Sequence, residues 1–187
     1  TRKTGRGGPA RLITVAMMRG GVKLESYEML AQALAVIAGH DWTLTIIGDG
    51  RERARVEKLF VQFEPGRITW TGEVSPGEVR SHLADGDIFV WPGIGEAYGL
   101  AYLEAQAAGL PVVALDTHGV PSAVEAKRTA LLTPPGDIAA YGAAIARLAG
   151  DAALRRKMAA KAISFARDER NIAMAADVID KAIRRIS

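Results

Sequence analysis

The sequence contains no cysteine, which excludes disulfide bridges, thiolate metal sites and cysteine nucleophiles together. Long hydrophobic runs are also missing. None approaches the roughly 20 residues of a membrane-spanning helix, and the basic N-terminal stretch is followed by a short mixed run rather than a signal-peptide core. The 187 residues are 49% hydrophobic and 24% charged, which is the balance of a soluble globular protein. We therefore expect one ordinary domain with a sizeable core, in a chain compatible with the cytoplasm.

The net charge of +3 suggests an acidic partner such as nucleic acid, but the charges are unevenly distributed. Residues 1–11 carry four basic residues and no acidic one, and residues 147–187 carry 10 basic and 5 acidic residues. Residues 12–146, in contrast, carry 10 basic and 16 acidic residues. Because only the two ends are basic, nucleic-acid or acidic-surface binding stays an alternative and is not the favoured function.

Hydrophobic patterns typical of strands and helices alternate from Arg11 to about residue 150. The expected strands cover residues 12–17, 42–47, 68–71, 88–91, 111–115 and 130–132. The expected helices cover residues 24–38, 51–63, 76–84, 98–108, 120–126 and 138–148. Strands joined by helices of this length predict a doubly wound α/β domain, in which helices cover both faces of a parallel sheet.

The two ends of the chain differ from this central pattern. Residues 1–10 are rich in glycine and charge and are expected to be a linker stub, followed by the α/β domain over residues 11–150. Residues 151–187 contain no strand pattern and predict two helices rich in alanine, lysine and arginine. We expect these extra C-terminal helices to pack on the domain or to leave it.

The segment PGIGEAYGLAYLEAQAAGLPVVA, residues 92–114, contains the strongest functional pattern. Glu96 precedes an expected helix, and Glu104 follows eight positions later within it. Two carboxylates flanking a helix start could grip sugar hydroxyls, while the free N–H groups near Tyr98–Leu100 favour a phosphate. Glu96 as an ordinary loop acid and Glu104 as a solvated helix residue explain the spacing equally well.

This segment looks like the signature of the retaining GT-B glycosyltransferases of family four, also named group 1. The segments IIGDG, ITWTGEV, ADGDIFVWP and LLTPPGD resemble further landmarks of that family in the same order. The resemblance covers about residues 11–160. It implies the Rossmann-like C-terminal domain of the GT-B fold, which binds a nucleotide-sugar donor such as a UDP- or GDP-sugar. The implied reaction is hexosyl transfer to an acceptor with retained configuration, without a metal or a further cofactor.

The resemblance also implies a role for particular residues. Glu104 would bind the ribose, and Glu96 would contact the donor sugar. Lys23 matches a family lysine that neutralises the leaving diphosphate, and Arg19 lies nearest to the family's second basic position, which falls on Met17–Met18. Catalysis would therefore depend on Lys23, Arg19 and Glu96. The backbone around Tyr98, Gly99 and Leu100 would bind the diphosphate. The segments from Gly48 to Gly50 and from Gly72 to Val74 would line the nucleotide and base pocket.

Two other motifs offer alternative functions. Gly93, Gly95 and Gly99, with Asp116 after the next strand, approximate a dinucleotide-binding fingerprint. That hypothesis of a non-catalytic nucleotide- or NAD-binding module leaves Lys23 and both glutamates unexplained. Residues 85–87, Asp-Gly-Asp, imitate a metal-binding motif. They lie at the opposite end of the sheet from the ligand loops, so we interpret both acids as solvated turn residues.

The remaining expectations concern a departure from the family pattern, a basic cluster near the C-terminus, and the rest of the enzyme. Gly93 stands where the family often has serine, and the RRK cluster at residues 155–157 predicts a solvated helix face. The family's acceptor site lies largely on an N-terminal domain that this sequence does not contain. The chain alone is therefore expected to bind donor and to transfer sugar poorly. The full enzyme is expected to be cytoplasmic, with peripheral membrane contact compatible with the resemblance.

Overall fold

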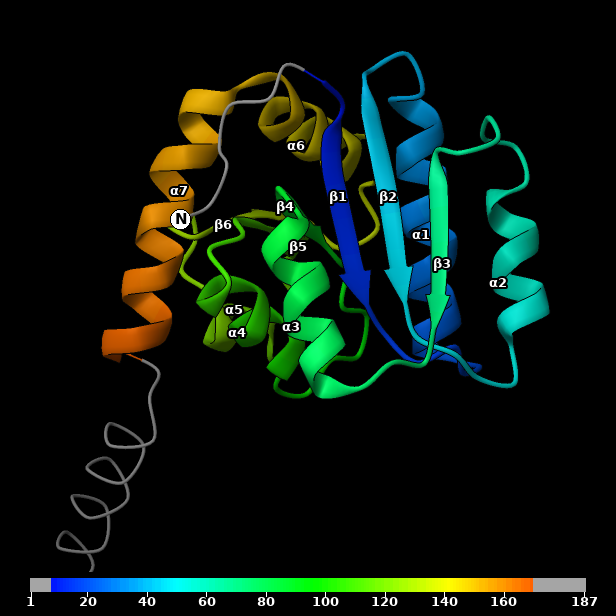
Figure 1. The fold of residues 1–187 in the computed structure, drawn as a ribbon, viewed down its shortest axis with the longest axis horizontal. Helices are drawn as coiled ribbons and strands as arrows, with labels where there is room; N and C mark the ends of the chain where they lie inside the picture. The colour runs from blue at the N-terminus through cyan, green and yellow to red at the C-terminus, as the bar shows by residue number, and fades with distance from the viewer. Residues whose placement is uncertain (1–7, 170–187) are drawn as a thin grey trace, which may run out of the picture.

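A computed structural model describes residues 8–169, and these residues form one six-stranded parallel sheet with helices around it (Figure 1). The strands are β1 (Ala10–Val15), β2 (Trp42–Ile47), β3 (Ile68–Gly72), β4 (Ile88–Val90), β5 (Val112–Leu115) and β6 (Ala130–Thr133). Every neighbouring pair is parallel, in the order β3-β2-β1-β4-β5-β6. The predicted doubly wound α/β fold is therefore confirmed.

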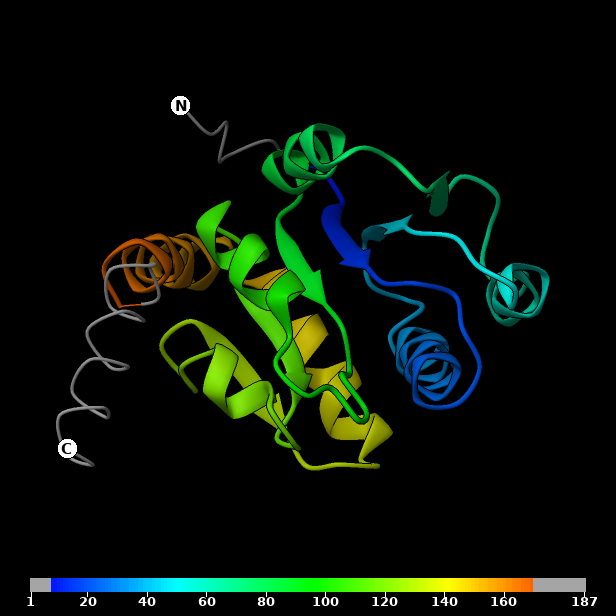
Figure 2. The same ribbon diagram turned by 90° about the horizontal axis from the view of Figure 1, so that it is seen from below.

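The helices connect successive strands and cover the sheet. They are α1 (Val22–Val36), α2 (Arg53–Phe60), α3 (Pro76–Asp85), α4 (Leu100–Ala107), α5 (Val120–Ala123), α6 (Ile138–Gly150) and α7 (Ala152–Ser164), followed by a π-helical turn at Phe165–Glu169. Helix α1 packs against α2 and α6, whereas α4 packs against α5 and α7. Figure 2 shows α1 and α3 on opposite sides of β1.

Local sequence explains where these elements form and begin. All residues of β4 and β5 are buried, as expected for inner strands of a parallel sheet that is covered on both faces. Ser75 and Glu78 form the predicted capping box at the start of α3. The Asp137 side chain accepts a hydrogen bond from the backbone N–H of Ala140 and so caps α6, as predicted.

The strand order reverses direction between β1 and β4, and this reversal positions the site. The loop after β1 runs to a helix on one face, and the loop after β4 runs toward a helix on the other. The two loops therefore separate and leave a crevice at the carboxyl ends of the strands, which is where open α/β sheets bind ligands. The arrowheads of β1, β2 and β3 in Figure 1 point to this edge.

Several predicted boundaries were displaced by a few residues. Helix α4 begins at Leu100 and not at Tyr98, because Gly99 adopts a left-handed conformation with φ 76° and ψ 54°. Strand β1 includes Ala10, which the sequence assigned to the linker. The second predicted C-terminal helix and the first seven residues of the predicted linker lie outside the described residues.

Two polar predictions were wrong for one residue each, because tertiary contacts bind that residue, whereas Asp85, Arg156 and Lys157 are exposed as predicted. Asp87, predicted as a solvated turn acid, accepts hydrogen bonds from the backbone N–H of Arg11 at 3.0 Å and from its guanidinium at 2.9 Å. Arg155, predicted on a solvated face, donates to the carbonyls of Leu148 and Ala149 at 2.5 and 2.6 Å. These contacts fix strand β1 to β4 and the end of α6 to α7.

Candidate functional site

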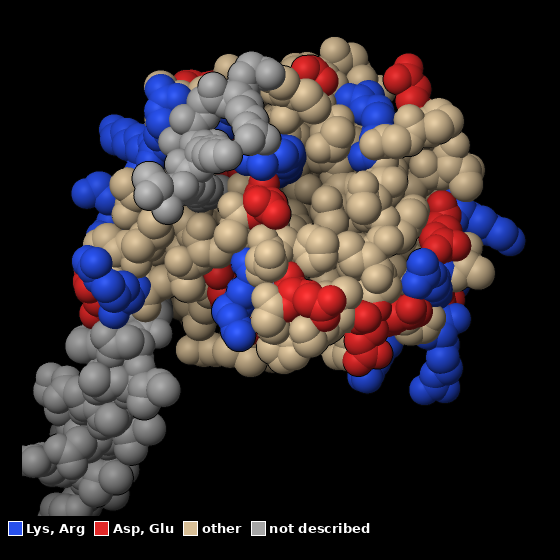
Figure 3. Space-filling view, in the orientation of Figure 1, with Lys and Arg blue, Asp and Glu red and all other residues tan. Residues whose placement is uncertain are grey.

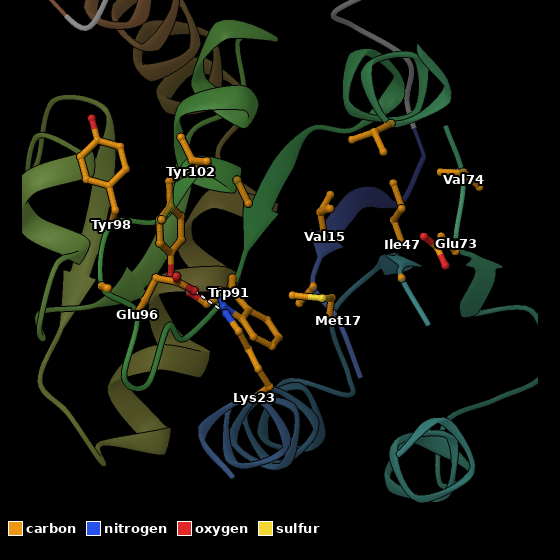
Figure 4. Close-up of a pocket in the computed structure, with 17 residues that line it drawn as sticks. Val15, Met17, Lys23, Ile47, Glu73, Val74, Trp91, Glu96, Tyr98 and Tyr102 are labelled. Atoms are coloured by element: carbon orange, nitrogen blue, oxygen red, sulfur yellow. Dashed lines mark hydrogen bonds and ion pairs between the residues drawn. The ribbon is translucent and has the colours of Figure 1, made fainter. Parts of the chain in front are cut away.

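A cleft of about 480 Å³ lies at the carboxyl ends of β1, β2 and β4. Its lining residues come from the ends of β1 and β2 and the loops after the three strands, from the start of α1 and α4, and from α3 with the segment that precedes it. Figure 4 shows Lys23 and Glu96 pointing toward each other on one side of the cleft, and Ile47 and Val74 beside the charged Glu73 on the other. The cleft thus coincides with the crevice that the sheet topology predicts.

An ion pair between Lys23 and Glu96 bridges the two loops that separate at the strand reversal. Lys23 lies in the first turn of α1 and Glu96 in the loop after β4, and their Nζ and Oε2 atoms are 2.5 Å apart. The two side chains are only 25% and 22% exposed. Lys23 Nζ also lies 5.6 Å from the centroid of the Trp91 ring, within reach of a cation–π interaction. The lysine is therefore held at one place in the cleft before any ligand arrives.

Three buried aromatic residues form a rigid support beneath this pair. Trp91 and Tyr27 pack edge to face with their ring centroids 4.9 Å apart. The Tyr27 hydroxyl donates to the carbonyl of Ala16, and the Tyr102 hydroxyl donates to the carbonyl of Trp91. Burial, and then the negative charge of Glu96, raise the pKa of Tyr102 well above its usual value. Tyr102 is therefore a neutral hydrogen-bond donor at ordinary pH.

The N-terminus of α4 opens into the cleft. Gly99, Leu100 and Ala101 all line the cleft, and no side chain caps this helix end. The first N–H groups of a helix carry no intrahelical partner and a partial positive charge, so they attract anions. Gly99 is required here, because a Cβ at its position would lie 2.4 Å from the Tyr102 ring. The arrangement of an open helix end beside Lys23 suits a phosphate group.

The other end of the cleft is formed by Ile47, Gly48, Glu73, Val74 and Val79. Gly48 allows the chain to pass close to the loop after β1, since a Cβ there would lie 2.1 Å from the carbonyl oxygen of Ala16. Its N–H donates to the carbonyl of Gly72 at 2.9 Å, which ties the ends of β2 and β3 together. This end offers apolar surface and backbone edges to a ligand.

The structure brings seven of the sequence-predicted site residues into the cleft lining and leaves four outside it. The seven are Lys23, Gly48, Val74, Glu96, Tyr98, Gly99 and Leu100. Those outside the lining are Arg19, Gly50, Gly72 and Glu104. Arg19 and Glu104 are exposed, and Gly50 allows close approach to the carbonyl of Met18, 2.2 Å from where its Cβ would lie.

Among the lining residues that the sequence analysis did not name are two aromatic residues and one acid, Trp91, Tyr102 and Glu73. Trp91 directly follows a predicted strand, and Tyr102 lies within the motif, so their positions carried a signal. Glu73 lies between two residues that were predicted to line the base pocket, Gly72 and Val74. Only the folded chain shows that the Tyr102 hydroxyl fills the space beside Gly93, where a Cβ would lie 2.1 Å from it.

The structure gives the alternative functions little support. Asp116 is exposed and lies outside the cleft lining. In residues 8–169, no three His, Asp or Glu side chains gather to hold a metal ion. On the face shown in Figure 3, the acidic and basic side chains of the described residues are interspersed, and residues 1–7 and 170–187 of the two basic ends lie outside the described part of the chain. No helix within the described part of the chain is long and apolar enough to cross a membrane.

Relatives named as glycosyltransferases align with most of the chain. The sulfoquinovosyl transferase of Arabidopsis thaliana is 33% identical over 135 residues, which are 71% of this chain and 25% of that protein. The α-D-kanosaminyltransferase of Streptomyces kanamyceticus is 30% identical over 161 residues, which are 86% of this chain and 42% of that protein. The chain thus spans between a quarter and less than half of the length of these relatives.

Solved structures share the fold. A sucrose-phosphate synthase from Thermosynechococcus elongatus superposes with a TM-score of 0.81 at 26% identity, over 96% of this chain and 46% of that one. The Anabaena protein HepE, in complex with UDP and glucose, gives a TM-score of 0.78 at 21% identity, over 95% and 48% of the two chains. The family model for glycosyl transferases of group 1 matches residues 9–151. The resemblance found in the sequence is thereby confirmed, and the chain belongs to the group 1 glycosyltransferase family.

Proposed function

We propose that this chain is the donor-binding domain of a retaining glycosyltransferase, which transfers a sugar from a nucleoside diphosphate to an acceptor. The observation that carries the proposal is the Lys23–Glu96 ion pair beside the open N-terminus of α4, within the cleft of a group 1 family member. A cation and a free helix end lie together where a leaving diphosphate would develop charge. HepE, a structural neighbour, was solved with UDP and glucose.

In this mechanism the chain's own groups stabilise the leaving diphosphate. The N–H groups at Gly99 and Leu100 bind its oxygens, and Lys23 neutralises the charge that grows as the glycosidic bond breaks. Glu96 contacts the donor sugar, whereas Gly48 and Val74 contact the nucleotide. Glu104 lies on the exposed side of α4 and Arg19 in an exposed loop, so roles for them at the ribose and phosphate require the donor to extend beyond the cleft lining.

A thermal-shift panel tests donor binding directly. UDP, GDP, ADP and their common sugars are compared with NAD, and we expect a nucleoside diphosphate to give the largest rise in melting temperature. Lys23→Ala should reduce that rise, whereas Lys58→Ala, which removes an exposed lysine of α2, should leave it unchanged. A larger shift with NAD that depends on Asp116 would instead favour the dinucleotide-binding module.

The complete reaction requires more than this chain. Because the chain covers at most 42% of the two curated relatives described above, we propose that the acceptor is bound by a further domain of a longer enzyme. The isolated chain should then bind donor but transfer sugar at a low rate, and robust transfer by this chain alone would contradict the proposal. A cytoplasmic location and membrane contact of the full enzyme stay predictions, which cell fractionation would test.

A further inference from the structure

One carboxylate in the cleft takes no part in the chemistry proposed above. Glu73 follows β3 and lines the cleft beside Val74 and Ile47, across from Lys23 and Glu96 (Figure 4). Its neighbours at this end of the cleft are otherwise apolar side chains and glycine. Glu73 is exposed, so its carboxylate lies at the solvent side of this end of the cleft. A charged group beside apolar surfaces can give direction to a ligand that those surfaces hold.

The Glu73 carboxylate is available to such a ligand. The other two charged side chains that line the cleft, Lys23 and Glu96, are paired with each other. The nearby Glu78 is occupied by the capping box at Ser75. Within residues 8–169, by contrast, the carboxylate of Glu73 forms no hydrogen bond or ion pair. Both of its oxygens can therefore accept hydrogen bonds from what enters the cleft.

The position of the diphosphate determines what reaches Glu73. If the phosphates lie at the N-terminus of α4 beside Lys23, a nucleoside that extends along the cleft reaches its opposite end, where the family resemblance places the base pocket. Ile47, Val74 and Val79 there provide apolar surface that suits the face of a planar base. Glu73 then lies where the hydrogen-bonding edge of that base would be.

The bases differ in what they offer a carboxylate. The Watson–Crick edge of guanine presents two adjacent donors, N1–H and the N2 amino group, which match the two oxygens of a carboxylate. Uracil presents one N–H between two carbonyl oxygens, and adenine presents one amino group beside a ring nitrogen that accepts. Of guanine, uracil and adenine, only guanine therefore offers a donor to both carboxylate oxygens at once.

We infer that Glu73 is a specificity-determining residue and that the donor carries guanine, so that the substrate is a GDP-sugar. This inference rests on the proposed function, because it requires the nucleotide to occupy the cleft. It narrows the donors that the sequence left open, namely UDP- and GDP-sugars, to one of them.

Isothermal titration with GDP, UDP and ADP at one ionic strength tests the inference. We expect GDP to bind at least about tenfold more tightly than UDP or ADP, which is the discrimination typical of a bidentate contact to a base. Glu73→Gln keeps the size of the side chain and replaces one acceptor with a donor. It should weaken GDP binding by about tenfold and leave UDP binding unchanged or tighter. Glu64→Gln, at an exposed acid outside the cleft lining, is the matched control and should change neither.

The outcomes separate this inference from the proposed function. If UDP or ADP binds more tightly than GDP, or if Glu73→Gln weakens all three equally, guanine selection by Glu73 is wrong while the donor-binding domain stands. If none of the three nucleotides binds, the proposed function fails and the inference fails with it.

Discussion

The ion pair between Lys23 and Glu96 predicts that the chain's own carboxylate competes with the donor diphosphate for the lysine. In the structure the Lys23 ammonium lies 2.5 Å from a Glu96 oxygen. A diphosphate that binds at α4 must attract this ammonium away from Glu96 and must also tolerate the nearby negative charge. Replacing Glu96 with glutamine removes the charge and keeps the shape, so nucleoside diphosphate binding should become tighter.

The exposure of the two side chains sets the magnitude. Fully exposed ion pairs contribute about 0–1 kcal/mol, whereas breaking a buried pair costs about 3–5 kcal/mol. With 25% and 22% of the two side chains exposed, the pair lies between these limits and part of its energy is recovered when the lysine reaches phosphate. We expect Glu96→Gln to tighten binding by about 1–2 kcal/mol, which is roughly a 5- to 30-fold lower Kd.

Isothermal titration at constant ionic strength measures this change, using the nucleoside diphosphate that gives the largest thermal shift. The same titration with the corresponding nucleotide-sugar should show a smaller gain, because the variant also loses the contact of Glu96 with the sugar. Making the same Glu96→Gln exchange in the Lys23→Ala variant separates competition for the lysine from simple repulsion between Glu96 and phosphate, because only the repulsion remains when the lysine is absent. If Glu96→Gln does not tighten binding, or does so equally in both backgrounds, the reasoning is refuted.

Three further perturbations test the packing around the cleft. Gly48→Ala should lower the free energy of unfolding by at least about 2 kcal/mol, because its Cβ would meet a backbone carbonyl at 2.1 Å; chemical denaturation measures this. Gly93→Ser should destabilise the chain through a clash with the Tyr102 hydroxyl, 2.1 Å from the new Cβ, and Tyr102→Phe in the same chain should restore part of the melting temperature. Burial would raise the pKa of Asp87, but the hydrogen bonds from Arg11 prevail and lower it. The stability from this group is therefore present above about pH 4 and is lost as the pH falls through the folded-state pKa. Asp87→Asn should lower the free energy of unfolding by about 1–2 kcal/mol at pH 7. It should also flatten the decline in stability below about pH 4, which denaturant unfolding at a series of pH values measures.

Each of these predictions has a control and a contradicting result. Gly39 has open space around its Cβ position, so Gly39→Ala should change stability far less than Gly48→Ala. A Tyr102→Phe exchange that destabilises the Gly93→Ser chain further would contradict the proposed clash. An unchanged pH profile in Asp87→Asn would show that other acids dominate the acid-induced loss of stability. Glu78 is one such acid, because its hydrogen bonds to Ser75 lower its pKa.

The sequence by itself determined the fold class and the order of the elements, because those depend on patterns that are local in the chain. Alternating apolar segments of strand and helix length predicted the parallel sheet, and capping residues such as Ser75 and Asp137 predicted where helices begin. The spacing of Glu96 and Glu104 carried the resemblance to the glycosyltransferase family. The position of the cleft followed from topology, since ligands of open parallel sheets bind at the carboxyl ends of the strands.

Only the tertiary structure decided which side chains meet across long separations in sequence. Lys23 and Glu96 are 73 positions apart, and Arg11 and Asp87 are 76 apart, so no local pattern could show that either pair forms. The fold likewise left Glu104 exposed and outside the cleft lining, because the paths of the chain, and not the residue types, determine which surface a carboxylate reaches. The chemistry available to a ligand is therefore set by contacts that form when the strands assemble.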